Sequence, residues 1–386
     1  MTKKVLLLAT FAVLLVACSA PQIGGPTAPR KAADAGQLTL PSGRTLWVYP
    51  EELMYSGVAR YQWPTSRSYD GEWNLGLPHG IGTELIESPA GQIRYHGQWR
   101  DGARHGHGEL NAPNGDHYVG SFVKGVRHGE GTETTAKGLY RGFWADDVPH
   151  GLGEFSSSDG SKFRGQWVRG SRNGHGTFID TRNNEYVGDW SADAPNGFGT
   201  FTSNAGAVYE GSWVDGARNG YGRLEEPSGL IYEGIWAANK RHGFGAEQRP
   251  DGSSYKGAWQ LDKRHGQGIE TQADGGYHDG TWENNVALGP GTRRQPSGIE
   301  ISGAWNSDLV STGLLTLPSG AEYAGPLFRK RNREADVKLI NWLTRLTDDG
   351  YANYLLGTLY LDFEKPARNE DRARRLLSKA TDAGIA

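Results

Sequence analysis

Residues 209–222 read Tyr-Glu-Gly-Ser-Trp-Val-Asp-Gly-Ala-Arg-Asn-Gly-Tyr-Gly, and variants of this stretch recur along most of the chain. Each clear copy starts with an aromatic residue, followed by a glycine two positions later and a second aromatic residue two positions after that. Clear copies start at residues 69, 95, 118, 140, 163, 186, 209, 232 and 255, and weaker ones at 278, 301 and 323. Because most starts lie 23 residues apart, the sequence predicts a repeat protein.

A second pattern begins ten residues after each start, where a histidine or asparagine precedes Gly-x-Gly in most copies. Alternate residues of a β-strand share a face, so the two aromatic residues and the glycine between them lie on one face of a first strand. A middle loop, the Gly-x-Gly and a short second strand then complete a hairpin, and turns such as Asn114-Gly115 or Asp251-Gly252 close the copy. About eleven stacked hairpins would form a continuous ladder of aromatic rings.

The repeat-defining residues resemble the MORN repeat (membrane occupation and recognition nexus), whose pattern is Tyr-x-Gly-x-Trp with a downstream His/Asn-Gly-x-Gly. The resemblance covers roughly residues 55–327. It implies a mainly β fold, an elongated single antiparallel β-meander of MORN hairpins, which acts as an interaction scaffold without chemistry of its own and leaves the partner open. The residues that carry the resemblance most clearly are Tyr95, Gly97, Trp99, Tyr186, Gly188, Trp190, Tyr209, Gly211, Trp213, Tyr232, Gly234 and Trp236.

Composition and charge exclude several other classes of protein. Glycine accounts for 57 of 386 residues, about twice the usual share, but without the every-third-residue rule of collagen. With 13 Trp and 17 Tyr, the chain is too aromatic for simple disorder. The net charge of −3 argues against nucleic acid as a partner, and a single cysteine excludes a disulfide framework or a cysteine-based zinc site.

The N-terminus predicts export. Lys3 and Lys4 precede an apolar stretch, Val5 to Val16, which is too short for a membrane span and suits a signal peptide. Leu15-Val16-Ala17-Cys18 resembles a bacterial lipobox, which implies a signal peptide over residues 1–17 and acylation of Cys18. The alternative is an ordinary signal peptide followed by a buried cysteine.

The residue after the cysteine, Ser19, implies by the same resemblance an outer-membrane lipoprotein that faces the periplasm of a diderm bacterium. Residues 18–38, rich in Pro, Ala and Gly, are predicted to form the lipidated cysteine and a flexible tether. Residues 39–68 are predicted to be an N-terminal cap or divergent repeat, and residues 69–327 the repeat array.

Residues 333–386 change in composition and show helical spacing of apolar residues. Residues 352–384 resemble a Sel1-type tetratricopeptide repeat, which implies a small helical docking segment. The three expected helix faces carry Val337, Ile340, Leu343 and Leu346, then Ala352, Leu355, Leu356, Leu359 and Tyr360, then Ala373, Leu376, Leu377 and Ala380, with Asn369 as a cap of the third helix.

An arginine column precedes the His/Asn column, at Arg104, Arg127, Arg172, Arg218, Arg241 and Arg264. Six cations at this spacing suit a polyanion such as an acidic polysaccharide or phospholipid headgroups. Alternatively, they form a solvated loop edge that nearby acids neutralise. The aromatic ladder likewise suits either sugar stacking or a core.

The His/Asn column suits a structural role beside glycine better than a metal site. Equivalent residues lie two strands apart, roughly 9.6 Å, too far to share one zinc ion. The sequence contains no G-x-S-x-G, no G-x-x-x-x-G-K-[ST] and no H-E-x-x-H. We therefore expect a protein that is not an enzyme and needs no cofactor or metal.

The resulting hypothesis is an elongated scaffold or spacer for envelope proteins at the outer membrane. The alternative is a module that binds an envelope polymer, namely an acidic polysaccharide, peptidoglycan or lipid headgroups. Pairing between exposed terminal strands of two copies would give a homodimer.

Overall fold

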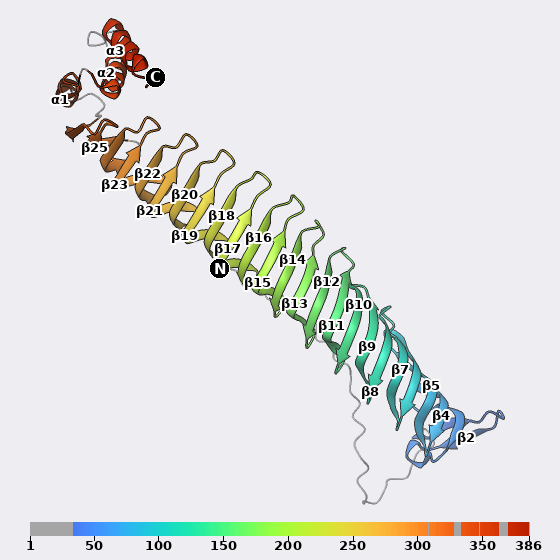
Figure 1. Ribbon diagram of the computed structural model, residues 1–386. Helices are drawn as coiled ribbons and strands as arrows, with labels where there is room; N and C mark the ends of the chain where they lie inside the picture. The colour runs from blue at the N-terminus through green and yellow to red at the C-terminus, as the bar shows by residue number, and fades with distance from the viewer. Residues whose placement is uncertain (1–33, 308, 328–332, 347, 363–369, 386) are drawn as a thin grey trace, which may run out of the picture.

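The computed structural model describes residues 34–307, 309–327, 333–346, 348–362 and 370–385. Its main feature is one antiparallel sheet of 26 strands, followed by three short helices (Figure 1). The fold class predicted from the repeat, a long β-meander with a small helical end, is confirmed.

The strands follow the repeat, with two strands in each copy. They are β1 (Gly36–Thr39), β2 (Thr45–Val48), β3 (Gly57–Gln62), β4 (Arg67–Asn74), β5 (Leu77–Ser88), β6 (Gly91–Arg100), β7 (Ala103–Asn111), β8 (His117–Val123), β9 (Val126–Thr135), β10 (Gly138–Ala145), β11 (Val148–Ser157), β12 (Lys162–Val168), β13 (Ser171–Ile179), β14 (Glu185–Ser191), β15 (Ala194–Thr202), β16 (Val208–Val214), β17 (Ala217–Glu225), β18 (Ile231–Ala237), β19 (Lys240–Gln248), β20 (Ser254–Gln260), β21 (Lys263–Thr271), β22 (Tyr277–Glu283), β23 (Val286–Arg294), β24 (Glu300–Asn306), β25 (Leu309–Thr316) and β26 (Glu322–Pro326).

From β4 onward, each strand pairs with its neighbours in sequence. Within the copy that starts at Tyr209, β16 and β17 pair Gly211 with Gly222 and then Trp213 with Arg218. Two residues of β16 therefore span the same distance as four residues of β17, which places a β-bulge at Asn219-Gly220. Gly220 has φ +91°, a conformation that favours glycine. The bulge explains why the His/Asn column is always followed by glycine.

The connection between the two strands of a copy differs from the predicted middle loop. It is a two-residue turn, for example Asp215-Gly216 with φ of 48° and 77°, in which both residues have positive φ. The second strand therefore begins before the Gly-x-Gly rather than after it. The turns that close the copies, such as those at Gly115 and Gly252, are as predicted, with φ of 89° and 86°.

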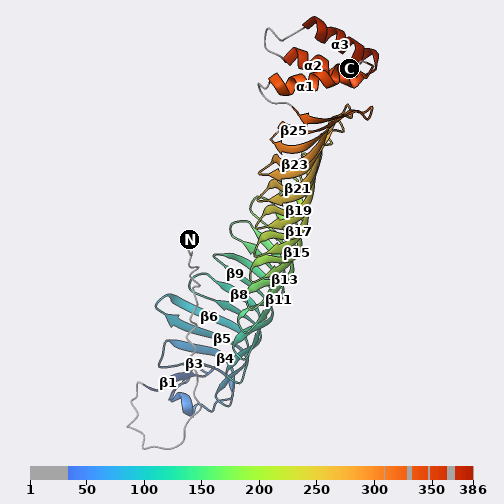
Figure 2. The ribbon, with the colours of Figure 1, turned by 90° about the vertical axis from the view of Figure 1, so that its left-hand side faces the viewer.

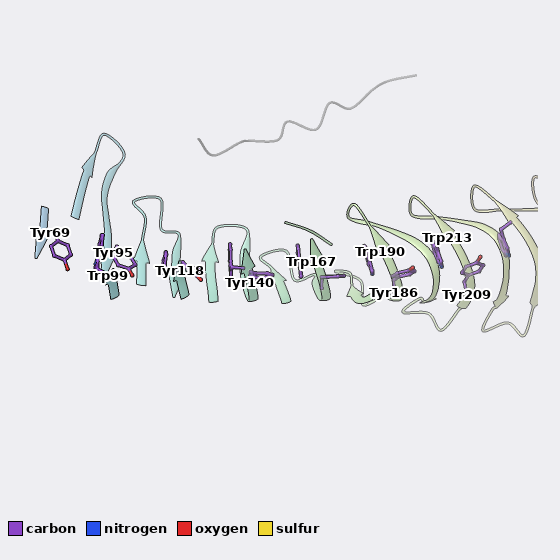
Figure 3. Close-up of a cluster of buried hydrophobic side chains, with 14 of the residues drawn as sticks. Tyr69, Tyr95, Trp99, Tyr118, Tyr140, Trp167, Tyr186, Trp190, Tyr209 and Trp213 are labelled. Carbon is purple, nitrogen blue, oxygen red and sulfur yellow. The ribbon is translucent and has the colours of Figure 1, made fainter. Parts of the chain in front are cut away.

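The core lies on one face of the sheet, which we call the inner face because it carries the Tyr and Trp residues (Figure 3). Tyr209 is 1 % exposed, and its ring contacts Trp213 of its own copy and Trp236 of the next at centroid distances of 5.2 and 5.5 Å. The same edge-to-face contacts repeat along the array, which confirms the predicted aromatic ladder. The opposite face is called the outer face below.

The N-terminal end adds β1 and β2, with a 3₁₀ turn at Pro50–Glu52 before β3. Strand β1 pairs with both β2 and β3, so β2 forms this edge of the sheet. Leu38 is 3 % exposed, so the last residues of the predicted tether belong to the sheet. Residues 1–17, Cys18 and the tether as far as residue 33 lie outside the described residues.

The C-terminal helices are α1 (Arg333–Leu343), α2 (Gly350–Asp362) and α3 (Glu370–Asp382), beyond the last strands in Figure 2. They share a hydrophobic cluster with strands β24 to β26, and Trp342 contacts Tyr323. Asp349 caps α2 by accepting the backbone N–H groups of Tyr351 and Ala352. None of the described helices is long and apolar enough to cross a membrane.

The helix faces are largely as predicted, with one correction. Ala352, Leu356, Ala373 and Ala380 are buried, but Val337 is 52 % exposed. The predicted Ile340, Leu343 and Leu346 do contact the core, and Leu339 is buried in place of Val337. The predicted spacing of three residues was therefore wrong only at the first position of this face. The predicted cap at Asn369 lies outside the part of the chain that the structure describes.

Candidate functional site

The inner face carries a groove over the middle of the array. A cavity of about 920 Å³ is lined by residues between Arg172 and Asp262, and a second of about 370 Å³, lined by residues between Phe155 and Asp193, adjoins it. Half-buried apolar residues at equivalent positions of the second strands line both cavities: Phe155, Phe178, Phe201 and Leu224. Glutamates take the same position on either side of this stretch, at Glu133 and at Glu247, so the continuous apolar floor spans four consecutive copies.

The Tyr and Trp residues under the groove have their polar atoms occupied. The Tyr209 hydroxyl donates to the Ser212 carbonyl at 3.1 Å, and the Trp213 Nε1 donates to the Gly199 carbonyl at 3.1 Å. Burial raises the pKa of Tyr209 to about 12. Tyr209 and Trp213 are only 1 % and 8 % exposed. Of the two alternatives for the aromatic ladder, the structure places these residues in the core rather than on a surface that could stack on sugars.

The six arginines of the predicted column lie on the second strands, one residue before the His/Asn position. Five of them place the guanidinium carbon 4.2 to 4.5 Å from the ring centre of the next copy's tryptophan. Arg104 differs because the next copy has Phe122 instead of tryptophan, and its guanidinium lies 5.0 Å from Tyr95. The six arginines are therefore half-buried rather than standing on a loop edge, and Arg172, Arg218 and Arg241 form part of the groove wall.

Each arginine is fixed by the turn of the following copy. The backbone N–H of the second turn residue donates to the backbone carbonyl of Arg218, Arg241 or Arg264. This turn residue is Asp or Asn, and its side-chain oxygen accepts the backbone N–H of the same arginine. Where a copy has proline in place of arginine, as at Pro149 and Pro195, the following turn has glycine, since proline has no N–H to offer.

This link between a residue and the turn of the next copy was present in the sequence but was not recognised there. The copies with Arg127, Arg172, Arg218, Arg241 and Arg264 are followed by Asp147, Asp193, Asn239, Asp262 and Asn285, and those with Pro78, Pro149 and Pro195 by Gly102, Gly170 and Gly216. Arg104, followed by Gly125, is the exception.

Carboxylates neutralise most of the column. Glutamates six residues further along contact Arg127, Arg241 and Arg264 at Nη1. The Arg172 Nε lies 3.1 Å from Asp193, and the Arg104 Nη2 lies 2.8 Å from Glu84, which is buried. A polyanion lying along the whole column would have to displace these internal ion pairs, which weakens that alternative.

The His/Asn column lies at the bulges and brings no ligand set together. Within the described ranges, no group of three or more His, Asp or Glu side chains is arranged to hold a metal ion. Asn173 accepts the N–H of Gly174, and the Asn196 amide donates to Asp215 of the following turn. These contacts fit a role in shaping the bulge.

Ten stretches match the MORN repeat family, at residues 69–86, 95–117, 118–139, 140–162, 163–184, 186–208, 209–230, 232–254, 255–277 and 278–299. Together they cover more than half of the chain. The chain belongs to the MORN-repeat family. The match includes the weak copy at His278, and the hairpin of β24 and β25 adds a further copy in which Ile301 and Trp305 are buried.

Several known proteins contain similar MORN arrays. Alsin of Rattus norvegicus is 40 % identical over 76 residues, which are 18 % of this chain and 4 % of Alsin. Human Alsin is 36 % identical over 103 residues, covering 22 % of this chain and 6 % of Alsin. The human ALS2 C-terminal-like protein is 32 % identical over 77 residues, covering 19 % and 8 %. The chain thus spans less than a tenth of these relatives.

A comparison with solved structures gives only a weak similarity. The TCP domain of SAS-4 from Drosophila melanogaster aligns over 46 % of this chain and 90 % of that domain, with 12 % identity and a TM-score of 0.28. This value is too low to carry an argument about fold or function. The MORN repeats themselves are typical of scaffolds and binding modules.

Proposed function

We propose that this MORN-repeat protein is an elongated, non-enzymatic scaffold of the cell envelope that binds an extended segment of a partner protein in its inner groove. The observation that carries the proposal is the apolar floor formed by Phe155, Phe178, Phe201 and Leu224. These side chains are only half-buried in the free chain, and a partner would complete their burial.

The backbone beneath the groove is already paired on both sides by neighbouring strands, so it offers no edge for strand addition. A partner must be recognised by side chains, namely the apolar floor and the arginine wall. Aromatic residues and arginine are the residue types that contribute most at protein interfaces. This setting favours a protein partner over an enzyme substrate, since the groove brings no catalytic constellation together.

The groove is tested by site-specific photocrosslinking in intact cells. A photoreactive residue in place of Leu230, which lines the larger cavity, is expected to crosslink to a small set of envelope proteins. The matched control is the same residue in place of Leu152, which is 62 % exposed on the outer face and is expected to give little crosslinking. Equal products from both positions, or none from Leu230, would contradict groove binding.

The membrane anchor is a separate part of the proposal and rests on the lipobox resemblance. Acyl chains on Cys18 would hold the array at the outer membrane, since several chains together anchor a protein stably. We expect Cys18→Ala to leave the protein soluble or as an uncleaved precursor when membranes are fractionated. As a control, Ser19→Asp should keep the lipid anchor but shift the protein to the inner membrane. Unchanged fractionation of Cys18→Ala would reject the anchor.

A further inference from the structure

One arginine of the column differs from the others in its electrostatic surroundings. At the other five, at least one carboxylate is in contact with the guanidinium. Arg127, for example, contacts the carboxylates of Glu133 and Asp147. The residues at the two equivalent positions around Arg218 are Leu224 and Asn239, and both are uncharged. Among the described residues, Arg218 forms no ion pair.

The guanidinium of Arg218 is nevertheless held in place within the wall of the larger cavity. Its carbon lies 4.2 Å from the ring centre of Trp236, and its Nη2 donates to the Asn239 carbonyl at 3.1 Å. Burial lowers the pKa of Arg218, because the charged form is partly removed from water, and the more distant charges of Tyr209 and Asp262 oppose this shift only in part. An anionic ligand would supply the missing partner.

The acids that line the cavity are engaged elsewhere or lie at its rim. Asp193 pairs with Arg172, Glu247 with Arg241 and Arg249, and Asp262 with Lys240 and Arg241, while Glu226 is exposed and accepts a hydrogen bond from Ser228. The vacant carboxylate position is therefore local to Arg218, and it lies beside an apolar floor rather than in a field of positive charge.

The spacing of the array matches one backbone conformation of a ligand. Successive copies lie two strand spacings apart, about 9.6 Å. A polyproline II segment has three residues per turn and rises about 3.1 Å per residue, so it presents one side chain to the same side about every 9.3 Å. Such a segment would place one side chain in each copy, and aromatic-lined grooves are the usual docking sites for this conformation.

We infer that the groove around Arg218 binds a partner segment in the polyproline II conformation, with an Asp or Glu carboxylate on the Arg218 guanidinium and an apolar side chain three residues away in the neighbouring copy at Pro195 and Phe201. This inference rests on the proposed function, namely that the groove takes a polypeptide. Pro195 replaces the arginine of that copy, which leaves its floor without a cation and suits an apolar side chain.

A lipid chain fits the same groove less well. Ion pairs at Arg172–Asp193 and at Arg241–Glu247 flank the site, and a uniform acyl chain would desolvate them without replacing their contacts with water. A peptide can place its carbonyl and N–H groups beside these pairs while its side chains cover the apolar floor. The alternation of charged and apolar surface along the groove thus favours a polypeptide.

The test uses a labelled peptide, Pro-Leu-Pro-Pro-Glu-Pro-Pro-Leu-Pro, capped at both ends, and the full chain. Its apolar residues lie three positions from the acid on both sides, so it can bind in either chain direction. We expect the Glu peptide to bind at least about ten-fold more tightly than its Gln counterpart, since a hydrogen-bonded charge pair is lost in the latter. No binding, or equal binding of the two peptides, would overturn the inference.

The matched variant is Leu224→Glu, which supplies the carboxylate from within the protein as Glu133 does for Arg127. It should fold, because four other copies have glutamate at this position, and it should weaken binding of the Glu peptide at least about ten-fold. The control Leu110→Glu makes the same change beside Arg104, outside both cavities, and should leave binding unchanged. Equal effects of the two variants would contradict the role of Arg218.

Selection of random displayed peptides on the full chain separates this inference from the proposed function. Enriched peptides with an acid and an apolar residue three positions apart, lost with Leu224→Glu, support both. Enriched peptides without the acid overturn the inference but keep a peptide-binding groove, and no enrichment overturns both. A last outcome is that no peptide binds, whereas dodecanoate binds saturably and Leu224→Glu abolishes this binding. That outcome would overturn the inference and assign the site to a lipid.

Discussion

Replacing Gly222 with alanine is expected to destabilise the middle of the array by about 3 kcal/mol or more, since overpacking a rigid core has costs of this order. A Cβ at this glycine would lie 2.3 Å from the Tyr209 hydroxyl oxygen and 2.5 Å from Cζ of the same ring. The ring cannot move away, because it is 1 % exposed and its hydroxyl donates to the Ser212 carbonyl. Hydrogen exchange of the backbone amides in β16 to β18 measures the effect.

The control for this substitution is Gly252→Ala. Gly252 has φ +86° in a turn between copies, and a Cβ there would meet nothing within 4 Å. It should cost only the backbone strain of about 1 kcal/mol and should leave exchange in β16 to β18 unchanged. If both variants gave the same exchange pattern, this would contradict the explanation that Gly222 is required because the Tyr209 ring lies so close to its backbone.

Replacing Trp236 with alanine is expected to cost about 3 to 5 kcal/mol and to disrupt the groove as well. Trp236 is 3 % exposed and contacts the rings of Tyr209 and Tyr232 at 5.5 and 5.1 Å. Its Nε1 donates to the Gly222 carbonyl at 3.2 Å, and it carries the stacked guanidinium of Arg218. The change leaves a cavity, an unpaired carbonyl and an unsupported arginine together.

Because the energy of a repeat array is a sum of copies and their neighbour contacts, the damage should stay near the substituted copy. Hydrogen exchange should therefore speed up in β16 to β19 and remain slow in β6 to β9. The exposed tryptophan Trp47, at 71 % on β2, provides the control, since Trp47→Ala removes little buried surface. A single global unfolding transition, with equal change in both regions, would contradict the view of the array as separate units.

Much of the fold could be predicted because each copy repeats the same local rules. The alternation of Tyr209, Gly211 and Trp213 fixes which face is buried, and the 23-residue period fixes the stacking. The bulge at Gly220 and the two-residue turns could not be placed, because a histidine or asparagine before glycine suits a loop as well as a strand. In α1, the exposed Val337 shows that a short helix allows more than one apolar face.

The candidate site was predicted only in part. The arginine positions were recognised, but their setting depends on contacts between copies: the tryptophan of the next repeat and the side chain of its turn. These partners lie 17 to 21 residues away, for example Trp236 and Asn239 for Arg218, and a pattern read copy by copy does not connect them. Comparing Asn239 with Asp193 and Asp262 across copies would have shown the missing carboxylate beside Arg218.

From β4 onward, each strand pairs only with the strands that precede and follow it in sequence, and this has a consequence for the evolution of the repeat number. Duplication or loss of one 23-residue copy would leave every other copy next to a copy of the same kind. The N-terminal strands and the C-terminal helices would therefore keep their contacts. Each event would alter the reach of the molecule by about 9.6 Å, the width of two strands. The distance between the two ends can therefore change only in steps of one repeat. A lineage could span a wider or narrower gap by changing the number of repeats, without any change of fold.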